Sequence, residues 1–318
     1  MPNGGGGGDD VSIGYLIPTR EAIMSGRPET ADLLDLAKRA EELGYHSVWA
    51  GDSLVARPRH EPLTLLTAIA AQTSRITVGT AVLLPALRHP VAMAHQVATL
   101  DRISEGRLVL GVGVAADTPA IRAEFAAAGV PFERRVGRLN DHLALCRALW
   151  SGAEITHHGE FYSVDGITIG PSPHTPGGPP LWMAGSIRAA QRRVGTRYDG
   201  WMPIGPSHSY AEGLANVRGA ATEAGRDRDE ITPAAYLTIS LHDDRATAER
   251  NLDEFLASYY SARSSAIRSW QACFAGPVQD LRTWIDEFVA AGARHLVLRF
   301  VGDHEHHLEQ CSEFVGGR

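Results

Sequence analysis

The sequence predicts an α/β fold, a TIM (β/α)8 barrel, on three observations. Apolar-periodic helices alternate with continuous apolar strands, a glycine follows the end of several helices, and the length of 318 residues suits one barrel of this kind. Strands that are apolar on both faces and separated by helices indicate a parallel sheet. The alternation therefore favours a barrel over an all-α or all-β fold.

The strand pattern occurs eight times. The candidate strands are Val11–Ile17, Ser47–Gly51, Ile76–Leu84, Arg107–Val114, Pro180–Gly185, Gly200–Ile204, Ala234–Leu241 and His295–Val301. An open doubly wound sheet is the alternative, but Gly111-Val-Gly113 is not followed by a glycine at the spacing of a dinucleotide-binding turn. Eight strands without that turn favour the barrel.

Glycines mark the ends of helices before several strands. Gly44 follows a helix with an apolar face, Gly106 precedes the fourth strand, and Gly292 precedes the last. A glycine just past a helix adopts the left-handed conformation at little cost. These positions define where helices stop and strands begin.

One segment interrupts the repeat. After a long helix over Glu133–Trp150, the segments Ile155–Ser163 and Ile167–Ile169 predict a hairpin, and five prolines then predict a stiff linker up to Pro180. We expect residues 155–180 to form an insertion between strands four and five, over the barrel mouth, that covers substrate or makes a dimer contact. Residues 11–318 would form one domain, and the glycine-rich residues 1–10 a disordered tail.

Composition limits the possible functions. A net charge of −7 and a pI near 6.0 give no support to nucleic-acid binding. Cys146, Cys273 and Cys311 are widely spaced and form no CxxC pair, so they indicate neither a disulfide framework nor a zinc site. No apolar run is long enough to span a membrane, and residues 1–10 lack the features of a signal peptide. We expect a cytoplasmic protein.

Several stretches together carry a family resemblance. They are Ser47-Val-Trp-Ala-Gly-Asp52, Gly79-Thr-Ala-Val-Leu-Leu-Pro85, Arg88-His-Pro90, Ala98 to Gly113, Gly129-Val-Pro-Phe-Glu-Arg-Arg135, His158-Gly-Glu-Phe-Tyr162, Pro179 to Gly185 and Asp199-Gly-Trp-Met-Pro203. In this order the chain resembles the bacterial luciferase-like family, the flavin monooxygenases and coenzyme F420 oxidoreductases that share a TIM barrel. The resemblance covers residues 11 to 314.

The resemblance implies a cofactor wall on strands three and four. The peptide at Ala81-Val82, after Thr80, is often cis in the family and packs against the central ring of the isoalloxazine. Gly113, Val114 and Ala115 would line the other side of the ring. Independently of the family, glycine within a strand often marks the close approach of a flat group. An ordinary barrel strand is the alternative interpretation.

After strand five, Ala184, Gly185 and Ser186 precede a helix. A helix start with small residues offers free N–H groups to an anion, and Ser186 adds a hydroxyl. The family places the cofactor phosphate here. A tight turn at Gly185 with Ser186 as N-cap is the simpler interpretation, and both can hold together.

Asp52 and Ser53 follow strand two, where a barrel carries catalytic groups. Asp52 could hold substrate or relay a proton. Many relatives have a histidine at the position of Ser53, so its role is lost here or taken by another group such as His60, His89 or His95. Ala116 likewise stands where some deazaflavin dehydrogenases have a proton-donating glutamate, which argues against a sugar-phosphate dehydrogenase.

Two further residues are substrate candidates. Arg299 ends the last strand and needs a partner, either an acid such as Asp52 or an anionic substrate. Trp201, on strand six, would pack in the barrel or line a hydrophobic chamber. The run His304-Glu-His-His307 has no convergent thiol or carboxylate, so we interpret it as a solvated face and predict no metal site.

The resemblance implies an oxidoreductase with a small-molecule substrate. We favour a monooxygenase that uses reduced FMN and O2, because the histidine and glutamate of the dehydrogenases are missing. The alternative is hydride transfer with coenzyme F420, and a non-catalytic flavin binder is the alternative of another class. Schiff-base chemistry is excluded because Lys38 is the only lysine. A homodimer and a separate flavin reductase are the expected partners.

Overall fold

A computed structural model describes residues 11–315. The described chain forms two compact units. The first unit comprises residues 11–18, 31–49 and 182–315, and the second comprises residues 19–30 and 50–181. The predicted disordered tail, residues 1–10, lies outside the described residues.

The strands of the first unit are all parallel. β1 (Ser12–Leu16) pairs with β2 (Ser47–Ala50) on one side and with β11 (His295–Val301) on the other. The long strand β9 (Thr232–Leu241) pairs with β11, with β10 (Cys273–Gly276) and with β8 (Gly200–Trp201), which pairs with β7 (Leu181–Met183). This is the parallel pairing that the sequence predicts.

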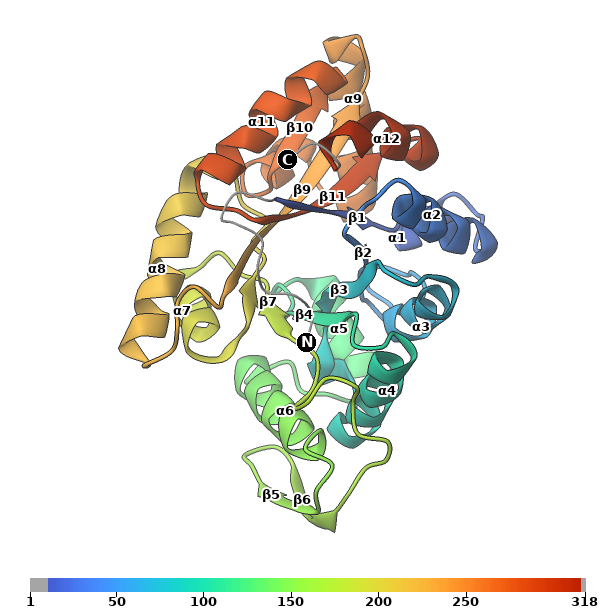
Figure 1. Cartoon of the computed structure of the whole chain (residues 1–318). Coiled ribbons are helices and arrows are strands. Elements are labelled where there is room, and N and C mark those ends of the chain that lie inside the picture. The colour runs from blue at the N-terminus through green and yellow to red at the C-terminus, as the bar shows by residue number, and fades with distance from the viewer. Residues whose placement is uncertain (1–10, 316–318) are drawn as a thin grey trace. The chain divides into compact units, whose positions relative to one another are not determined.

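Helices connect these strands. They are α2 (Ala31–Glu42), α7 (Arg188–Arg197), α8 (Tyr210–Glu223), α9 (Arg245–Tyr260), α10 (Ser264–Arg268), α11 (Val278–Ala290) and α12 (His304–Cys311). Helices α7 and α8 lie side by side (Figure 1). Gly195 of α7 permits this approach, because a Cβ there would overlap the Val217 carbonyl of α8.

The second unit contains the parallel pair β3 (Thr77–Leu83) and β4 (Leu108–Val112). Its helices are α1 (Thr19–Met24), α3 (Pro62–Gln72), α4 (Pro90–Ile103), α5 (Pro119–Ala127) and α6 (Arg135–Leu149). The predicted hairpin is present as the antiparallel pair β5 (Ile155–His158) and β6 (Ser163–Ile167). The second hairpin strand therefore begins earlier than predicted.

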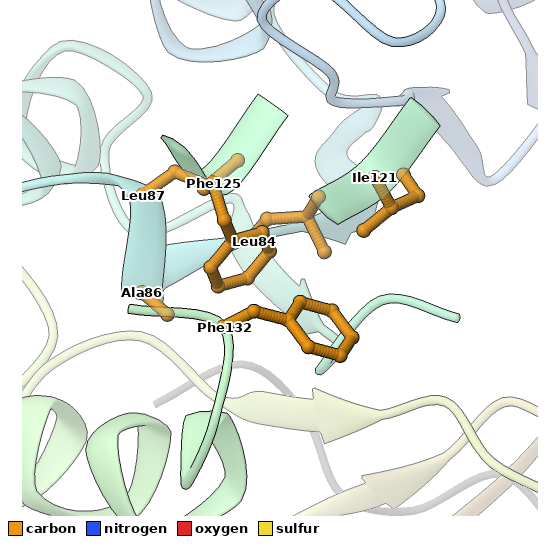
Figure 2. Packing of buried hydrophobic residues seen from close by; sticks show 6 residues of the cluster. All are labelled: Leu84, Ala86, Leu87, Ile121, Phe125 and Phe132. Atoms are coloured by element: carbon orange, nitrogen blue, oxygen red, sulfur yellow. The ribbon is translucent and has the colours of Figure 1, made fainter. Parts of the chain in front are cut away.

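A hydrophobic cluster joins the segment after β3 to α5 (Figure 2). Its six buried residues are Leu84, Ala86, Leu87, Ile121, Phe125 and Phe132. Phe125 and Phe132 meet edge to face at 5.3 Å between ring centroids. This packing fixes α5 against the end of β3.

All eight predicted strands are present, with ends trimmed by one to three residues at most positions. Strand β10 was not predicted, because Cys-Phe-Ala-Gly is too short to show a periodic pattern. The long helix begins at Arg135 rather than Glu133, since Arg134 has a φ of +61°. The three glycines that end helices, Gly44, Gly106 and Gly292, all have positive φ as predicted.

Within the described residues, no helix has the length and apolar character needed to cross a membrane. The three cysteines are free, and Cys146 and Cys311 are buried as core residues.

Candidate functional site

Strand β3 is irregular where the sequence places the cofactor wall. The peptide bond between Ala81 and Val82 is cis, as the resemblance implies, and the register with β4 shifts between Thr80 and Leu83. Thr80 is fully buried and donates its hydroxyl hydrogen bond to the Gly111 carbonyl at 2.8 Å. Ala81 and Val82 are half-buried, whereas their neighbours Thr80 and Leu83 are fully buried.

Gly113 has a packing role within the strands, and its predicted place in the cofactor wall stays a prediction. A Cβ at this position would lie 2.7 Å from Val82 Cγ2. The glycine therefore makes room for a side chain of the neighbouring strand. Sequence alone could not separate these cases, since both need an absent side chain.

Arg135 holds the segment after β4, and sequence reasoning missed it. Its Nε donates to the Val114 carbonyl at 3.1 Å, and its guanidinium lies 4.0 Å from the centroid of the Phe132 ring. Ala115 has a φ of +61°, a left-handed conformation that this anchoring supports. A cation in the first turn of α6 interacts unfavourably with the positive end of the helix dipole. The position of Arg135 could therefore have indicated from sequence that its side chain has a specific partner.

Asp52 forms a buried ion pair. Its carboxylate oxygens accept from Arg88 Nη1 at 2.6 Å and Nη2 at 3.0 Å, and also from the Leu84 amide at 2.9 Å. The Asp52 side chain is 1% exposed. Burial by itself would lower the pKa of Arg88, but Asp52 and Glu61 outweigh this and raise it. Asp52 is thus engaged in holding the segment after β3.

Ser53 is bound to a buried carboxylate that the sequence did not reveal. Its Oγ donates to Glu124 Oε1 at 2.6 Å, and the same oxygen accepts from the Val55 and Ala56 amides at 2.9 and 3.1 Å. Glu124 is fully buried on α5. Because Ser53 Oγ also accepts from the Arg57 amide at 2.8 Å, this pair shapes the loop after β2.

A cavity of about 230 Å³ opens at the start of α7 in the first unit. Ser186 lines it, and Gly185, with a φ of +144°, turns the chain into it. The Gly185 carbonyl accepts from Trp201 Nε1 at 2.9 Å, and the Ser186 carbonyl accepts from Gln191 Nε2 at 2.9 Å. Both carbonyls are therefore held by side chains, and the turn is rigid. Ala184 leads into it, half-buried.

Arg188, Gln191 and Asn216 also line this cavity, and the sequence analysis missed all three. Arg188 is the first residue of α7, where the positive end of the helix dipole disfavours a cation. Asn216 Nδ2 donates to Gln191 Oε1 at 3.1 Å. A guanidinium, hydroxyls and free helix N–H groups together suit a bound anion. The sequence signal for this site was Arg188, a cation at the N-terminal end of a helix.

The two substrate candidates lie in different surroundings. Trp201 is 1% exposed and lines the α7 cavity. Arg299 is also 1% exposed, donates from Nη2 to Thr238 Oγ1 at 3.0 Å, and has four aromatic rings within 5.5 Å of its Cζ. Those rings belong to Tyr236, Phe255, Tyr259 and Tyr260. Cation–π contacts account for the tolerance of this buried cation.

The histidines take several roles. His89 precedes α4 as its N-cap residue, and His95 is exposed on the same helix. The ring nitrogens of His60 lie 3.3 Å from the Thr19 carbonyl and 2.8 Å from the Pro28 carbonyl, which ties the loop to α1.

The predicted solvated face at residues 304–307 needs correction. His307 is 6% exposed, and burial lowers its pKa to about 4. His304 Nδ1 lies 2.9 Å from the Tyr15 hydroxyl. The helical period of α12 turns these two rings inward and leaves Glu305 and His306 exposed. Among residues 11–315 there is no group of three or more His, Cys, Asp or Glu side chains placed to hold a metal ion.

The sequence profile of the luciferase-like monooxygenases matches residues 11–317. The chain belongs to this family. An F420-dependent glucose-6-phosphate dehydrogenase of Nakamurella multipartita is 34% identical over 227 residues, which are 69% of this chain and 66% of that protein. The match thus spans slightly less than two thirds of that relative's length. The luciferase-like family is one of oxidoreductase enzymes, and the predicted resemblance is confirmed.

Two solved structures share the fold. A monooxygenase from Streptomyces bottropensis has a TM-score of 0.81 at 23% identity, over 95% of this chain and 98% of the other. An F420-dependent secondary alcohol dehydrogenase, in complex with an F420–acetone adduct, has a TM-score of 0.81 at 20% identity, over 96% and 98%. The fold is the parallel (β/α)8 barrel that the sequence predicts.

Proposed function

We propose that this luciferase-like protein is a coenzyme F420-dependent oxidoreductase that transfers a hydride to or from a small organic molecule. The arginine-rich helix α7 carries the proposal. It contains four arginines and no acidic residue, and Arg188 lines the cavity at its start. The described residues offer none of the four a salt bridge.

The charge of α7 distinguishes the two candidate cofactors. FMN ends in one phosphate group, whereas coenzyme F420 carries a phosphodiester followed by glutamate carboxylates. A run of arginines matches the longer anionic tail. The similarity to F420-dependent dehydrogenases supports the same choice. Reduced FMN, favoured by the missing histidine and glutamate, has weaker support, because those residues concern the substrate step and not cofactor identity.

The residues present fit this cofactor. In the first unit, Ser186, Arg188 and the N–H groups at the start of α7 would bind the phosphodiester. In the second unit, the bulge at Ala81 and Val82 is the segment that the family resemblance assigns to the ring. Val114 and Ala115, held by Arg135, would complete that wall. When bound, the deazaflavin supplies a two-electron hydride carrier that reacts poorly with oxygen, and the protein orients it and excludes water.

The two residues after β2 have positioning roles in this proposal. Asp52 orients Arg88 and the segment after β3, and Ser53 with Glu124 shapes the loop that follows β2. Neither side chain is placed as a free acid or base. We assign Trp201 to the cofactor cavity, since its indole N–H holds the Gly185 carbonyl.

Glucose 6-phosphate is not the proposed substrate. Ala116, where some deazaflavin dehydrogenases have a proton-donating glutamate, is exposed after β4 and offers no acid. A second enzyme would recycle the cofactor, in place of the flavin reductase expected for FMN. We retain the homodimer as part of the proposal.

Cofactor binding tests the proposal directly. Purified protein is titrated with coenzyme F420 and with FMN, each oxidised and reduced, and fluorescence gives the Kd. We expect tighter binding of F420, and Arg188→Met should raise its Kd about tenfold, the loss of one charge-assisted contact. Arg228→Met, on the exposed segment before β9 and outside α7, is the matched control and should change the Kd less than about twofold. Tighter binding of FMN, with a peroxyflavin band on admitting air, would establish the monooxygenase instead.

A further inference from the structure

The cavity at the start of α7 also lies at the start of α8. The two helices run side by side (Figure 1), and Arg188 lines the cavity from α7 while Glu212 lines it from the first turn of α8. Neither helix start has a side-chain cap. Ser209, the N-cap residue of α8, donates its hydroxyl to the Pro206 carbonyl at 3.0 Å instead. The positive ends of two helix dipoles therefore meet at this cavity.

Two charged side chains line the cavity, and they are of opposite sign. They are Arg188 and Glu212, and both are exposed. Among residues 11–315, neither side chain has a hydrogen bond or an ion pair, and no ion pair joins them to each other. Each is therefore available to a group that enters the cavity.

The carboxylate of Glu212 also has a simpler explanation, because an acid in the first turn stabilises a helix. That explanation does not require a place in the cavity. Ala211, in the same turn of α8, is exposed and does not line the cavity, and an acid there would serve the dipole equally. Glu212 instead places a negative charge where the rest of the lining attracts an anion.

The charges around the cavity leave a small positive excess. Each helix start contributes about half an elementary charge. The Arg188 guanidinium adds a full positive charge and the Glu212 carboxylate a full negative one, so the net charge is about +1. A phosphodiester carries one negative charge at neutral pH. A phosphomonoester carries about 1.5 to 2, because its second pKa is about 6. The cavity thus matches the charge of a phosphodiester.

We propose that Glu212 makes this cavity selective for a singly charged phosphodiester over a doubly charged phosphomonoester. This inference rests on the proposed function, since that difference separates coenzyme F420 from FMN. Attraction to the cavity grows in proportion to the charge of the anion, whereas the cost of removing its hydration grows with the square of that charge. A net charge of about +1 compensates the desolvation of the diester better than that of the dianion. Without Glu212 the excess would double, and the dianion would gain the more.

Two phosphate probes test the role of Glu212 without any cofactor. Methyl phenyl phosphate is a monoanion, and phenyl phosphate is a dianion at pH 8. Calorimetric titration of the native protein should give the lower Kd for methyl phenyl phosphate. Glu212→Gln should lower the Kd of the monoanion about threefold and that of the dianion about tenfold, because the repulsion that is removed is proportional to the charge of the anion.

Matched variants separate this effect from a change in the helix. Glu212→Asp keeps the charge and should keep the native order of the two probes. Glu223→Gln removes the same charge from the exposed last residue of α8, which does not line the cavity. It lies about 16 Å further along the helix and should leave both Kd values within about twofold. Riboflavin, which has no phosphate, should bind the native protein and Glu212→Gln equally.

The cofactors extend the test, and its outcomes distinguish this inference from the proposed function. Glu212→Gln should narrow the preference for F420 over FMN about threefold. Native protein without affinity for F420 would overturn the proposed function, and the two phosphate probes would still judge Glu212. Native protein that binds neither probe would overturn the cavity as an anion site. Equal fold-changes for the two probes in Glu212→Gln, or none, would overturn the selectivity role of Glu212.

Discussion

Replacing His142 by phenylalanine tests how burial controls a titratable group in this fold. His142 lies on α6 with a fully buried ring, and neither ring nitrogen has a hydrogen-bond partner among residues 11–315. The ring meets Tyr162 edge to face at 5.7 Å. Burial lowers the pKa of His142 to about 3, and the positive charges of His89 and Arg88 act in the same direction, against Asp141.

The sign of the pH effect follows from this shift. The folded pKa lies below the ordinary value of 6.5, so the unfolded chain binds the proton more readily. Stability is complete above pH 6.5 and falls as the pH drops toward 3. At pH 5, protonation of the imidazole shifts the folding equilibrium about 30-fold toward the unfolded chain. This lowers the free energy of unfolding by about 2 kcal/mol.

The variant His142→Phe removes that cost together with two unsatisfied polar atoms. At pH 7 we expect it to be more stable by about 1 kcal/mol, because the lost desolvation penalty outweighs slight overpacking. At pH 5 the gain should grow to about 3 kcal/mol. His142→Leu provides a second apolar variant of smaller size.

Guanidinium chloride unfolding at pH 7 and pH 5 measures both gains. His208→Phe is the matched control, since His208 is exposed in the short segment before α8 and should show the same stability difference at both pH values. Equal stabilisation of His142→Phe at the two pH values would refute the reasoning, because it would mean that the buried ring does not resist protonation.

Three further predictions concern the site. Asp52→Asn should destabilise the protein by about 3 kcal/mol, since it weakens a buried pair with Arg88. Chemical unfolding measures this difference, and an unchanged free energy of unfolding would contradict it. Gly113→Ala should cost about 1–3 kcal/mol by overpacking Val82, whereas a neutral result would show that the strand has spare room. Arg135→Met should weaken F420 binding several-fold in a fluorescence titration while the melting temperature changes little, and loss of folding instead would show a purely structural role.

The positions of the elements were predictable because their signals are local. Helix ends at Gly44, Gly106 and Gly292 follow from the conformational freedom of glycine, and the strands follow from apolar runs between them. Strand β10 was missed because its four residues have no such signal. The inward turn of His304 and His307 was missed because two rings one turn apart on α12 show their face only when the helix is packed.

In the candidate site, too, the features that depend on neighbouring residues were predictable and those that depend on distant contacts were not. The turn at Gly185 and Ser186 and the bulge at Ala81 and Val82 could be placed from residue order and the family resemblance. The partners that give side chains their roles could not. Glu124, which accepts from Ser53, is separated from it by 71 residues in the chain, and only the packing of α5 brings them together.

The sequence by itself determined the family, the order of strands and helices, and the segments that follow the strands, because each depends on patterns within a few neighbouring residues. The tertiary structure decided what those segments do. It showed that Asp52 binds Arg88, that the Val82 side chain occupies the space beside Gly113, and that the Arg59 guanidinium lies above Gly51. Such contacts join residues far apart along the chain, and their distances are fixed only when the whole core packs.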